Sequence, residues 1–205
     1  MKISHLPLVF ALAALLSVLN TAFANGVDLQ ISTKGIAVGE EIIMHPPHLV
    51  DKDGNLESPT SKLSDDELTL EYPSGLQVRL EVDGDAVECD LSNVPADAKG
   101  LKFRFVLPVN FFLNGGKFAA GGDEAVFFPE TADGQFVTKG SSKNNFVLTN
   151  NTGEAVEINF PANWYGLQDN RIFNNNQTFQ LDVIYDFAVH PNQTEFEITF
   201  SRPAK

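Results

Sequence analysis

The stretch Leu76-Gln-Val-Arg-Leu-Glu-Val82 alternates apolar and polar residues, which is the pattern of a β-strand with one buried face. It ends at Asp83-Gly84, a dipeptide typical of a tight turn, and the alternation resumes in Ala86-Val-Glu-Cys-Asp-Leu91. These residues predict a β-hairpin. Cys89 lies on the apolar face of its second strand, so we expect a buried thiol. Because it is the only cysteine, the chain can form no internal disulfide.

Similar short runs of strand character follow one another along the chain. Proline, glycine and asparagine residues separate them, and no long stretch has the helical period. This pattern predicts an all-β fold, a single antiparallel β-sandwich of jelly-roll-like form over residues 25–205. The clearest further runs are residues 27–33, 40–44, 67–72, 101–107, 145–149, 155–160, 178–187 and 195–200.

The first residues have the composition of a signal peptide. Lys2 supplies a positive charge, residues 6–19 are almost entirely apolar, and Ala22-Phe23-Ala24 resembles a cleavage site. The apolar run is shorter than the roughly 20 residues of a membrane-spanning helix. We therefore expect residues 1–24 to be removed and the protein to be secreted or periplasmic. A retained N-terminal membrane anchor is the alternative.

The chain is strongly acidic, with 27 Asp and Glu residues against 14 Lys and Arg residues and a net charge of −13. Such a charge disfavours nucleic acid and anionic membrane surfaces as partners. No cluster of basic residues is visible along the sequence, and an acidic polysaccharide would need one. The expected partners are neutral glycans, cations or other proteins.

One segment, Pro161-Ala-Asn-Trp-Tyr-Gly-Leu-Gln-Asp-Asn-Arg-Ile-Phe173, combines aromatic rings with amides and charges, and it contains the only Trp. Sugar-binding sites pair aromatic faces with a few placed polar groups. We therefore expect a ligand-binding loop between two strands. In the alternative, the Trp plugs the core and the charged residues hold loop carbonyls. The candidate ligand-binding residues are Asn163, Trp164, Tyr165, Gln168, Asp169, Asn170 and Arg171.

Signals for a metal site are weak. His45 and His48 flank Pro46-Pro47, but a third ligand is missing, and exposed loop histidines are the favoured interpretation. Asp51-Lys-Asp-Gly-Asn55 has the acidic alternation of a calcium loop, yet its glycine comes too early. A plain turn is favoured there. No cofactor is expected, and the acidity leaves only a structural calcium ion open.

The amino-acid sequence also lacks the common catalytic motifs. No Gly-x-Ser-x-Gly element, phosphate-binding loop or dinucleotide fingerprint occurs. Asp182 and Asp186 share one strand face, where they would either point into a groove or form the wet face of an edge strand. The wet face is the favoured interpretation, and no catalytic residue is assigned.

Part of the chain resembles a known class of domains. The stretches are Phe103-Arg-Phe-Val-Leu-Pro-Val109, Asn114-Gly-Gly116, Phe128-Pro-Glu130 and Trp164-Tyr-Gly-Leu-Gln-Asp-Asn-Arg171. Together, residues 102–186 look like the accessory, carbohydrate-binding-type β-sandwich domains of bacterial polysaccharide-degrading systems. The resemblance implies a secreted sandwich connected with carbohydrate. It provides no catalytic residue.

Three functions remain open on the sequence. The first is a secreted, non-catalytic carbohydrate-binding or accessory protein that uses the segment around Trp164. The second is a small secreted polysaccharide lyase or glycosidase that uses Tyr165 or Tyr185 with Arg171, or a carboxylate pair. The third is a structural or adhesive envelope protein in which that segment only fills the core.

Overall fold

The computed structural model describes residues 26–173 and 176–203. Within these residues the chain forms two antiparallel β-sheets that face each other, with one short helix, α1 (Val109–Phe112), and one 3₁₀ turn, η1 (Asn170–Ile172). The predicted all-β sandwich is therefore confirmed. The predicted signal peptide, residues 1–24, lies outside the described residues. In the part of the chain described here, no helix has the length and apolar character needed to span a membrane.

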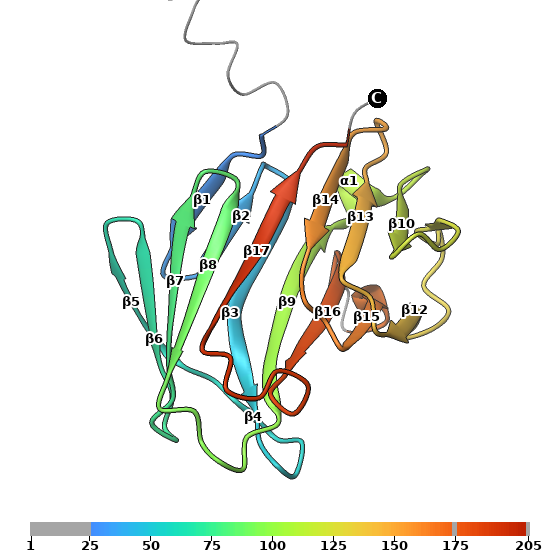
Figure 1. The fold of residues 1–205 in the computed structure, drawn as a ribbon. Helices are drawn as coiled ribbons and strands as arrows, with labels where there is room; N and C mark the ends of the chain where they lie inside the picture. Colours follow the sequence, from blue (N-terminus) through green and yellow to red (C-terminus); the bar gives the residue numbers. More distant parts are fainter. Residues whose placement is uncertain (1–25, 174–175, 204–205) are drawn as a thin grey trace, which may run out of the picture.

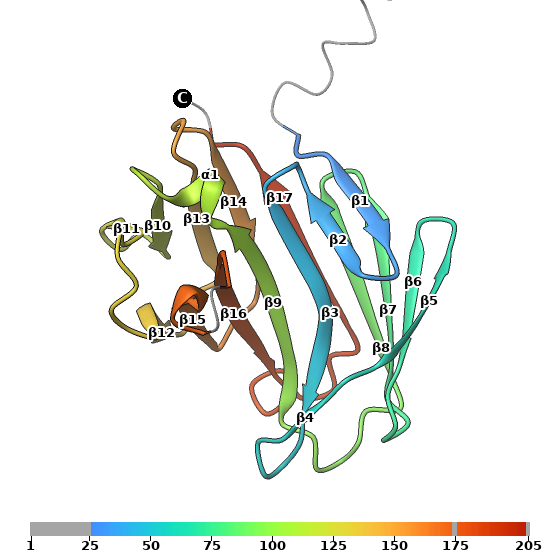
Figure 2. The ribbon, with the colours of Figure 1, turned by 180° about the vertical axis from the view of Figure 1, so that it is seen from behind.

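The first sheet, here called sheet A, has the strand order β1-β2-β3-β9-β16-β15-β12, and the short strand β4 pairs with β3. Figure 2 views the molecule from the side of this sheet. Its long central strands β3, β9 and β16 run side by side. The strands are β1 (Leu29–Ser32), β2 (Gly35–Val38), β3 (Ile42–Val50), β4 (Leu56–Glu57), β9 (Gly100–Pro108), β12 (Phe136–Ser141), β15 (Trp164–Asp169) and β16 (Thr178–Asp186).

The second sheet, sheet B, has the order β11-β10-β13-β14-β17-β8-β7-β6-β5. The predicted hairpin is its β7–β8 pair, in which Asp83 faces Ala86 and Gly84 adopts the left-handed backbone with φ of 63°. The strands are β5 (Thr60–Ser64), β6 (Glu67–Glu71), β7 (Gln77–Asp83), β8 (Ala86–Ser92), β10 (Lys117–Ala120), β11 (Val126–Phe127), β13 (Asn145–Thr149), β14 (Ala155–Asn159) and β17 (Glu195–Ser201).

The core between the sheets is rich in phenylalanine. Phe103 of sheet A makes edge-on contacts with Phe160 and with Phe196 of sheet B, with ring centroids 5.0 and 6.0 Å apart. Such pairs add about 0.5–1.5 kcal/mol to the burial of their apolar area. Cys89 is buried in this core, as predicted, and burial raises the pKa of its thiol. The inner faces of both sheets are thus used for packing.

Candidate functional site

The segment expected to be a loop, residues 161–173, is instead strand β15 followed by η1. A strand points successive side chains to opposite faces. Tyr165 therefore faces the core, where its ring lies 5.9 Å from that of Phe118 and 5.4 Å from that of Phe146. It is 5% exposed, so it is a core residue and not the stacking platform that the sequence suggested.

Asp169 and Arg171 hold the chain together locally. Arg171 donates through Nε and Nη2 to the two carboxylate oxygens of Asp169, at 2.9 and 2.6 Å. Its guanidinium also donates to the carbonyl oxygens of Pro129 and Glu130 and lies over the ring of Phe179. The hydrogen bonds to Asp169 raise the pKa of Arg171. The alternative interpretation was correct for this pair, because the charges anchor loop carbonyls and leave little for a ligand.

The two asparagines of the segment also serve the fold. The Asn163 side-chain oxygen accepts a hydrogen bond from the backbone N–H of Asp186 at 3.2 Å. Asn170 is buried, and its amide nitrogen donates to Gln180 at 3.1 Å and to Thr178 at 3.3 Å. These contacts join the strand end and η1 to β16, so both asparagines have a structural role.

Trp164 and Gln168 remain, and both lie on the outer face of sheet A. A Cβ atom at Gly166 would come within 2.7 Å of the Trp164 ring and within 3.0 Å of the Phe136 ring. The Trp164 ring is half-buried, and Phe136 is exposed. Both rings lie over the bare backbone of Gly166, and any larger residue at position 166 would clash with them. The Lys139 ammonium stands 5.2 Å from the centroid of the Phe136 ring. We call Trp164, Phe136 and Gly166 the aromatic platform.

A buried carboxylate lies next to the aromatic platform, because Asp182 of β16 pairs directly with Gly166. Asp182 is 0% exposed although it belongs to the outer face of the sheet. Four side chains cover it and donate to its two oxygens: Lys102 at 2.6 Å, Gln180 at 2.9 Å, Gln168 at 3.1 Å and Arg104 at 3.3 Å. The favoured interpretation of Asp182 as a solvated residue of an edge strand is therefore wrong. β16 lies inside the sheet between β9 and β15, and the carboxylate is the centre of a polar cluster.

The two histidines beside the prolines join this cluster from β3. They stand three residues apart, which in a regular strand would put them on opposite faces. A bulge at Pro46-Pro47 restores the alignment, so that His45 faces Arg104 and His48 faces Lys102. The Pro47 carbonyl is held in place by the hydroxyl of Tyr72, at 2.7 Å. The expected exposed loop histidines are instead half-buried members of a strand.

The charges around these histidines affect their protonation. Burial lowers the pKa of both rings, and the positive charge of Arg104 lowers it further. For His48, Lys102 adds to this effect and Asp182 opposes it. Both imidazoles are therefore mainly neutral at neutral pH, and Nδ1 of His48 lies 3.2 Å from the hydroxyl of Ser58. These mutual effects indicate that five side chains face one another across β3, β9 and β16: His45, His48, Lys102, Arg104 and Asp182.

No metal site accompanies the cluster in residues 26–173 and 176–203, where no group of three or more His, Cys, Asp and Glu side chains is placed to hold an ion. The acidic stretch at residues 51–55 is a turn. The carboxylate of Asp51 accepts the backbone N–H groups of Asp53 and Asn55, at 2.8 and 2.7 Å.

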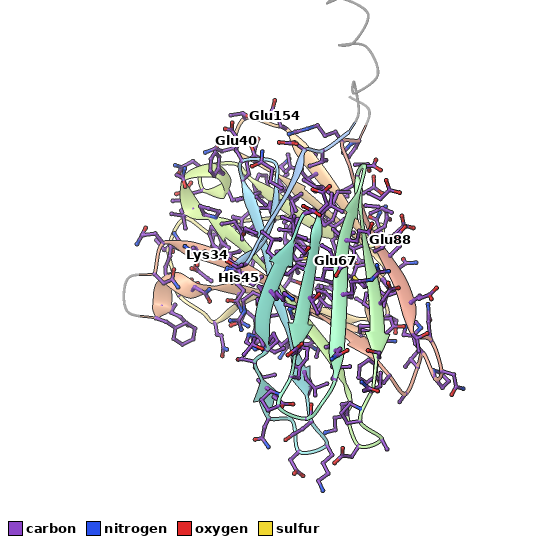
Figure 3. All side chains as sticks on the ribbon, turned by 90° about the vertical axis from the view of Figure 1, so that its left-hand side faces the viewer. Lys34, Glu40, His45, Glu67, Glu88 and Glu154 are labelled. Atoms are coloured by element: carbon purple, nitrogen blue, oxygen red, sulfur yellow. The ribbon has the colours of Figure 1, made fainter. Side chains whose placement is uncertain are left out.

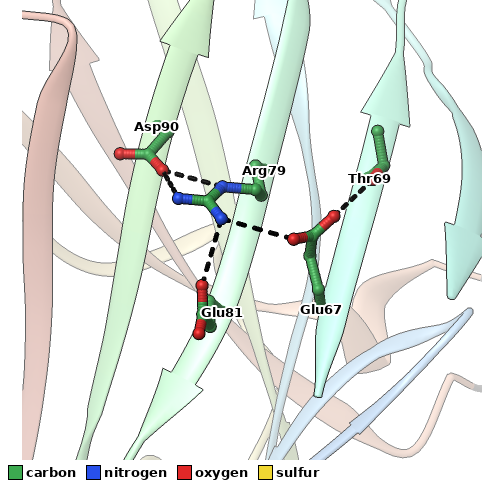
Figure 4. A network of polar contacts seen from close by, with 5 residues as sticks. All are labelled: Glu67, Thr69, Arg79, Glu81 and Asp90. Atoms are coloured by element: carbon green, nitrogen blue, oxygen red, sulfur yellow. Dashed lines mark hydrogen bonds and ion pairs between the residues drawn. The ribbon is translucent and has the colours of Figure 1, made fainter. Parts of the chain in front are cut away.

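The outer face of sheet B provides a contrast. There Arg79 contacts Glu67, Glu81 and Asp90 on three neighbouring strands (Figure 4). Each of these four side chains is about one third exposed or more. The network is solvated and lacks an aromatic partner, so it resembles an ordinary wet sheet face and serves below as a control.

Reasoning from the sequence missed Phe136, Lys139, Lys102 and Arg104. One signal for them was available. Lys102 and Arg104 alternate with large apolar residues in the run 101–107, as Gln180 and Asp182 do in the run 178–187. Charged residues of both signs on the polar faces of two long apolar strands indicate a cluster, provided that the strands are neighbours.

Comparisons with known proteins find only weak similarity to solved structures. No family model matches the chain, and no curated protein matches it. The chain is similar to a crystal structure of a putative aldose 1-epimerase from Escherichia coli K12, with a TM-score of 0.40 and 14% identity over 73% of this chain and 68% of that chain. It is also similar to a GH31 family sulfoquinovosidase from E. rectale in complex with an aza-sugar inhibitor, with a TM-score of 0.38 and 11% identity. This second similarity covers 88% of the present chain but only 27% of the sulfoquinovosidase.

Proposed function

We propose that this protein binds carbohydrate on the outer face of sheet A, with a sugar ring stacked on the aromatic platform. The observation that supports the proposal is that the rings of Trp164 and Phe136 lie over Gly166. Both rings are at least partly exposed on this face, and sugars offer apolar C–H surfaces that pack on aromatic rings. Because the platform is built on strands, it is fixed before a ligand arrives, which lowers the entropy cost of binding.

The polar cluster beside the platform provides the hydrogen-bonding groups that a sugar needs. Gln168 donates one N–H to Asp182, and its side-chain oxygen lies 3.5 Å from the amide nitrogen of Gln135. It is half-buried, so it keeps hydrogen-bonding capacity toward solvent. The neutral ring of His45 adds an acceptor on the same face. A hydroxyl-rich ligand finds both donors and acceptors here.

A non-catalytic role fits this arrangement better than the lyase or glycosidase alternative. Tyr165 and Tyr185 are buried, and burial raises the pKa of Tyr185 to about 12. Arg171 is engaged with Asp169 and with loop carbonyls. Tyr165, Tyr185 and Arg171 thus have structural roles. In the proposed function the protein is exported, with residues 1–24 removed, and acts in the periplasm or outside the cell.

Trp164→Ala should weaken glycan binding by about tenfold or more, because a ring at the centre of a contact surface is worth about 2 kcal/mol. Binding of the wild type and the variant to a panel of neutral and acidic oligosaccharides would be measured by calorimetry. Phe127→Ala is the matched control, since Phe127 is 61% exposed and lies under Lys117 on the edge strand β11 of sheet B. It should bind as the wild type does.

Circular dichroism would first establish that both variants are folded. A folded Trp164→Ala protein that binds every glycan as tightly as the wild type would refute the proposal. Product analysis on the same panel tests the enzymatic alternative, because new reducing ends or double bonds would show turnover of the sugar.

A further inference from the structure

The candidate face is basic, although the protein as a whole is acidic. Two rows of paired residues cross sheet A through this site. One contains His45, Arg104, Asp182, Gly166 and Lys139, and the other contains His48, Lys102, Ile184, Trp164 and Ser141. Among these residues there are three cations and a single carboxylate. The sequence suggested no basic cluster, because Lys102 and Arg104 lie on β9 and Lys139 lies on β12, and the strand pairing alone brings these two strands into one sheet.

Acidic residues elsewhere do not cancel this local charge. Figure 3 shows His45 on the side of sheet A and Glu88 on the opposite side of the sandwich, on sheet B. At physiological ionic strength exposed charges are screened beyond about 8 Å. A ligand bound on the platform therefore responds mainly to Lys102, Arg104, Lys139 and Asp182, which together carry a net positive charge, and only weakly to the net charge of −13 of the whole chain.

The guanidinium of Arg104 has hydrogen-bond donors that no protein acceptor uses within the described residues. It is bound to Asp182 through Nε alone, at 3.3 Å. Within the described residues, its two terminal nitrogens have no protein acceptor, and its side chain is 31% exposed. A guanidinium presents these nitrogens as a planar fork that matches the oxygens of a carboxylate or a sulfate. The site thus has an unused anion-binding group of defined geometry.

The position of Arg104 suits a ligand held on the platform. Arg104 pairs with Asp182, and Asp182 pairs with Gly166 beneath the rings. Arg104 and Gly166 therefore lie in the same row, two strand spacings or about 10 Å apart across the sheet. A short oligosaccharide stacked on Trp164 spans that distance along the row. On the basis of the proposed function, we infer that the ligand is an anionic glycan, whose carboxylate or sulfate group binds Arg104 with Lys102 beside it.

The first test needs no variant. Oligogalacturonides would be compared with their methyl esters, which keep the sugar and remove only the charge. Sulfated galactan oligosaccharides would be compared with their desulfated forms. The wild type should bind one of the charged forms about tenfold or more tighter than its uncharged partner, since a charge-assisted hydrogen bond is worth about 1.5–3 kcal/mol. The preferred pair identifies the carboxylate or the sulfate, and added salt should weaken that binding only.

The second test uses Arg104→Gln, with Arg79→Gln on the outer face of sheet B as the matched control. Arg104→Gln should remove most of the preference for the charged form over the uncharged form. Arg79→Gln should keep the full preference. If Arg104→Gln does not fold, the comparison of charged and uncharged ligands on the wild type still decides.

The possible results separate this inference from the proposed function. Equal binding of charged and uncharged forms would overturn the anionic ligand while glycan binding stands. Binding of no glycan at all would overturn both. A preference for charge that survives in Arg104→Gln would contradict the assignment of the anion to Arg104.

Discussion

Arg171→Met is expected to lower the free energy of unfolding by about 3–5 kcal/mol, the cost of removing one partner from a buried ion pair. Asp169 is 1% exposed and would lose both hydrogen bonds from the guanidinium. The carbonyls of Pro129 and Glu130 would lose their donors as well. Urea unfolding of the wild type and the variant, followed by circular dichroism, measures the difference.

The control is Arg79→Met, which also removes an arginine that contacts carboxylates. Because Arg79 and its partners are exposed, water replaces the lost contacts, and stability should change little. Equal losses for the two variants would contradict the view that Asp169 and Arg171 form a structural anchor. So would an Arg171→Met protein that is as stable as the wild type but no longer binds glycan.

Asp182→Ala is expected to cost about 3 kcal/mol of unfolding free energy. The substitution leaves Lys102 and Arg104 side by side without the carboxylate between them, and it removes the acceptor of Gln168 and Gln180. The loss should lie at the lower end of the range for buried pairs, because both cations can reach water. Asp186→Ala, on the same strand but half-buried, should cost only about 1 kcal/mol through its hydrogen bond from Ala188.

A double-mutant cycle locates the cause of the effect. Combined with Lys102→Met, the Asp182→Ala substitution should cost at least about 1 kcal/mol less than the sum of the two single changes, because each removes the same 2.6 Å contact. Strict additivity in the denaturation experiment would mean that Asp182 does not depend on Lys102, and the description of the cluster would then be wrong.

Local patterns were sufficient to predict the class of the fold. The hairpin at residues 77–92 combines clean alternation with Asp83-Gly84, and both signals act between near neighbours in the chain. The sandwich follows because each such strand has one apolar face to bury.

The segment with Trp164 was harder to interpret. Its strand has polar residues on both faces, since Asp169 points inward and is matched there by Arg171. Gly166 interrupts the outer face because the two rings occupy the space above it. Both features hide the period of two, so the segment looked like a loop. Tertiary partners, which the local sequence does not contain, made it a strand.

The polar cluster could not be predicted for a different reason. Arg104 and Asp182 are 78 residues apart and meet only because β9 pairs with β16 in one particular register. A shift of one residue would send every outer side chain into the core. The histidines depend on a bulge as well. The register and the bulge depend on the packing of the whole sheet. The contacts between these residues could therefore not be predicted from the sequence.

Titrating glycan into the wild type while recording tryptophan fluorescence tests the central claim most directly, because Trp164 is the only tryptophan. A sugar stacked on its ring changes the surroundings of the indole. We expect a saturable change in emission, with the same midpoint as calorimetry on the same ligand, and we expect it also in Phe127→Ala. A glycan that binds by calorimetry but leaves the emission of Trp164 unchanged at saturation would contradict the account.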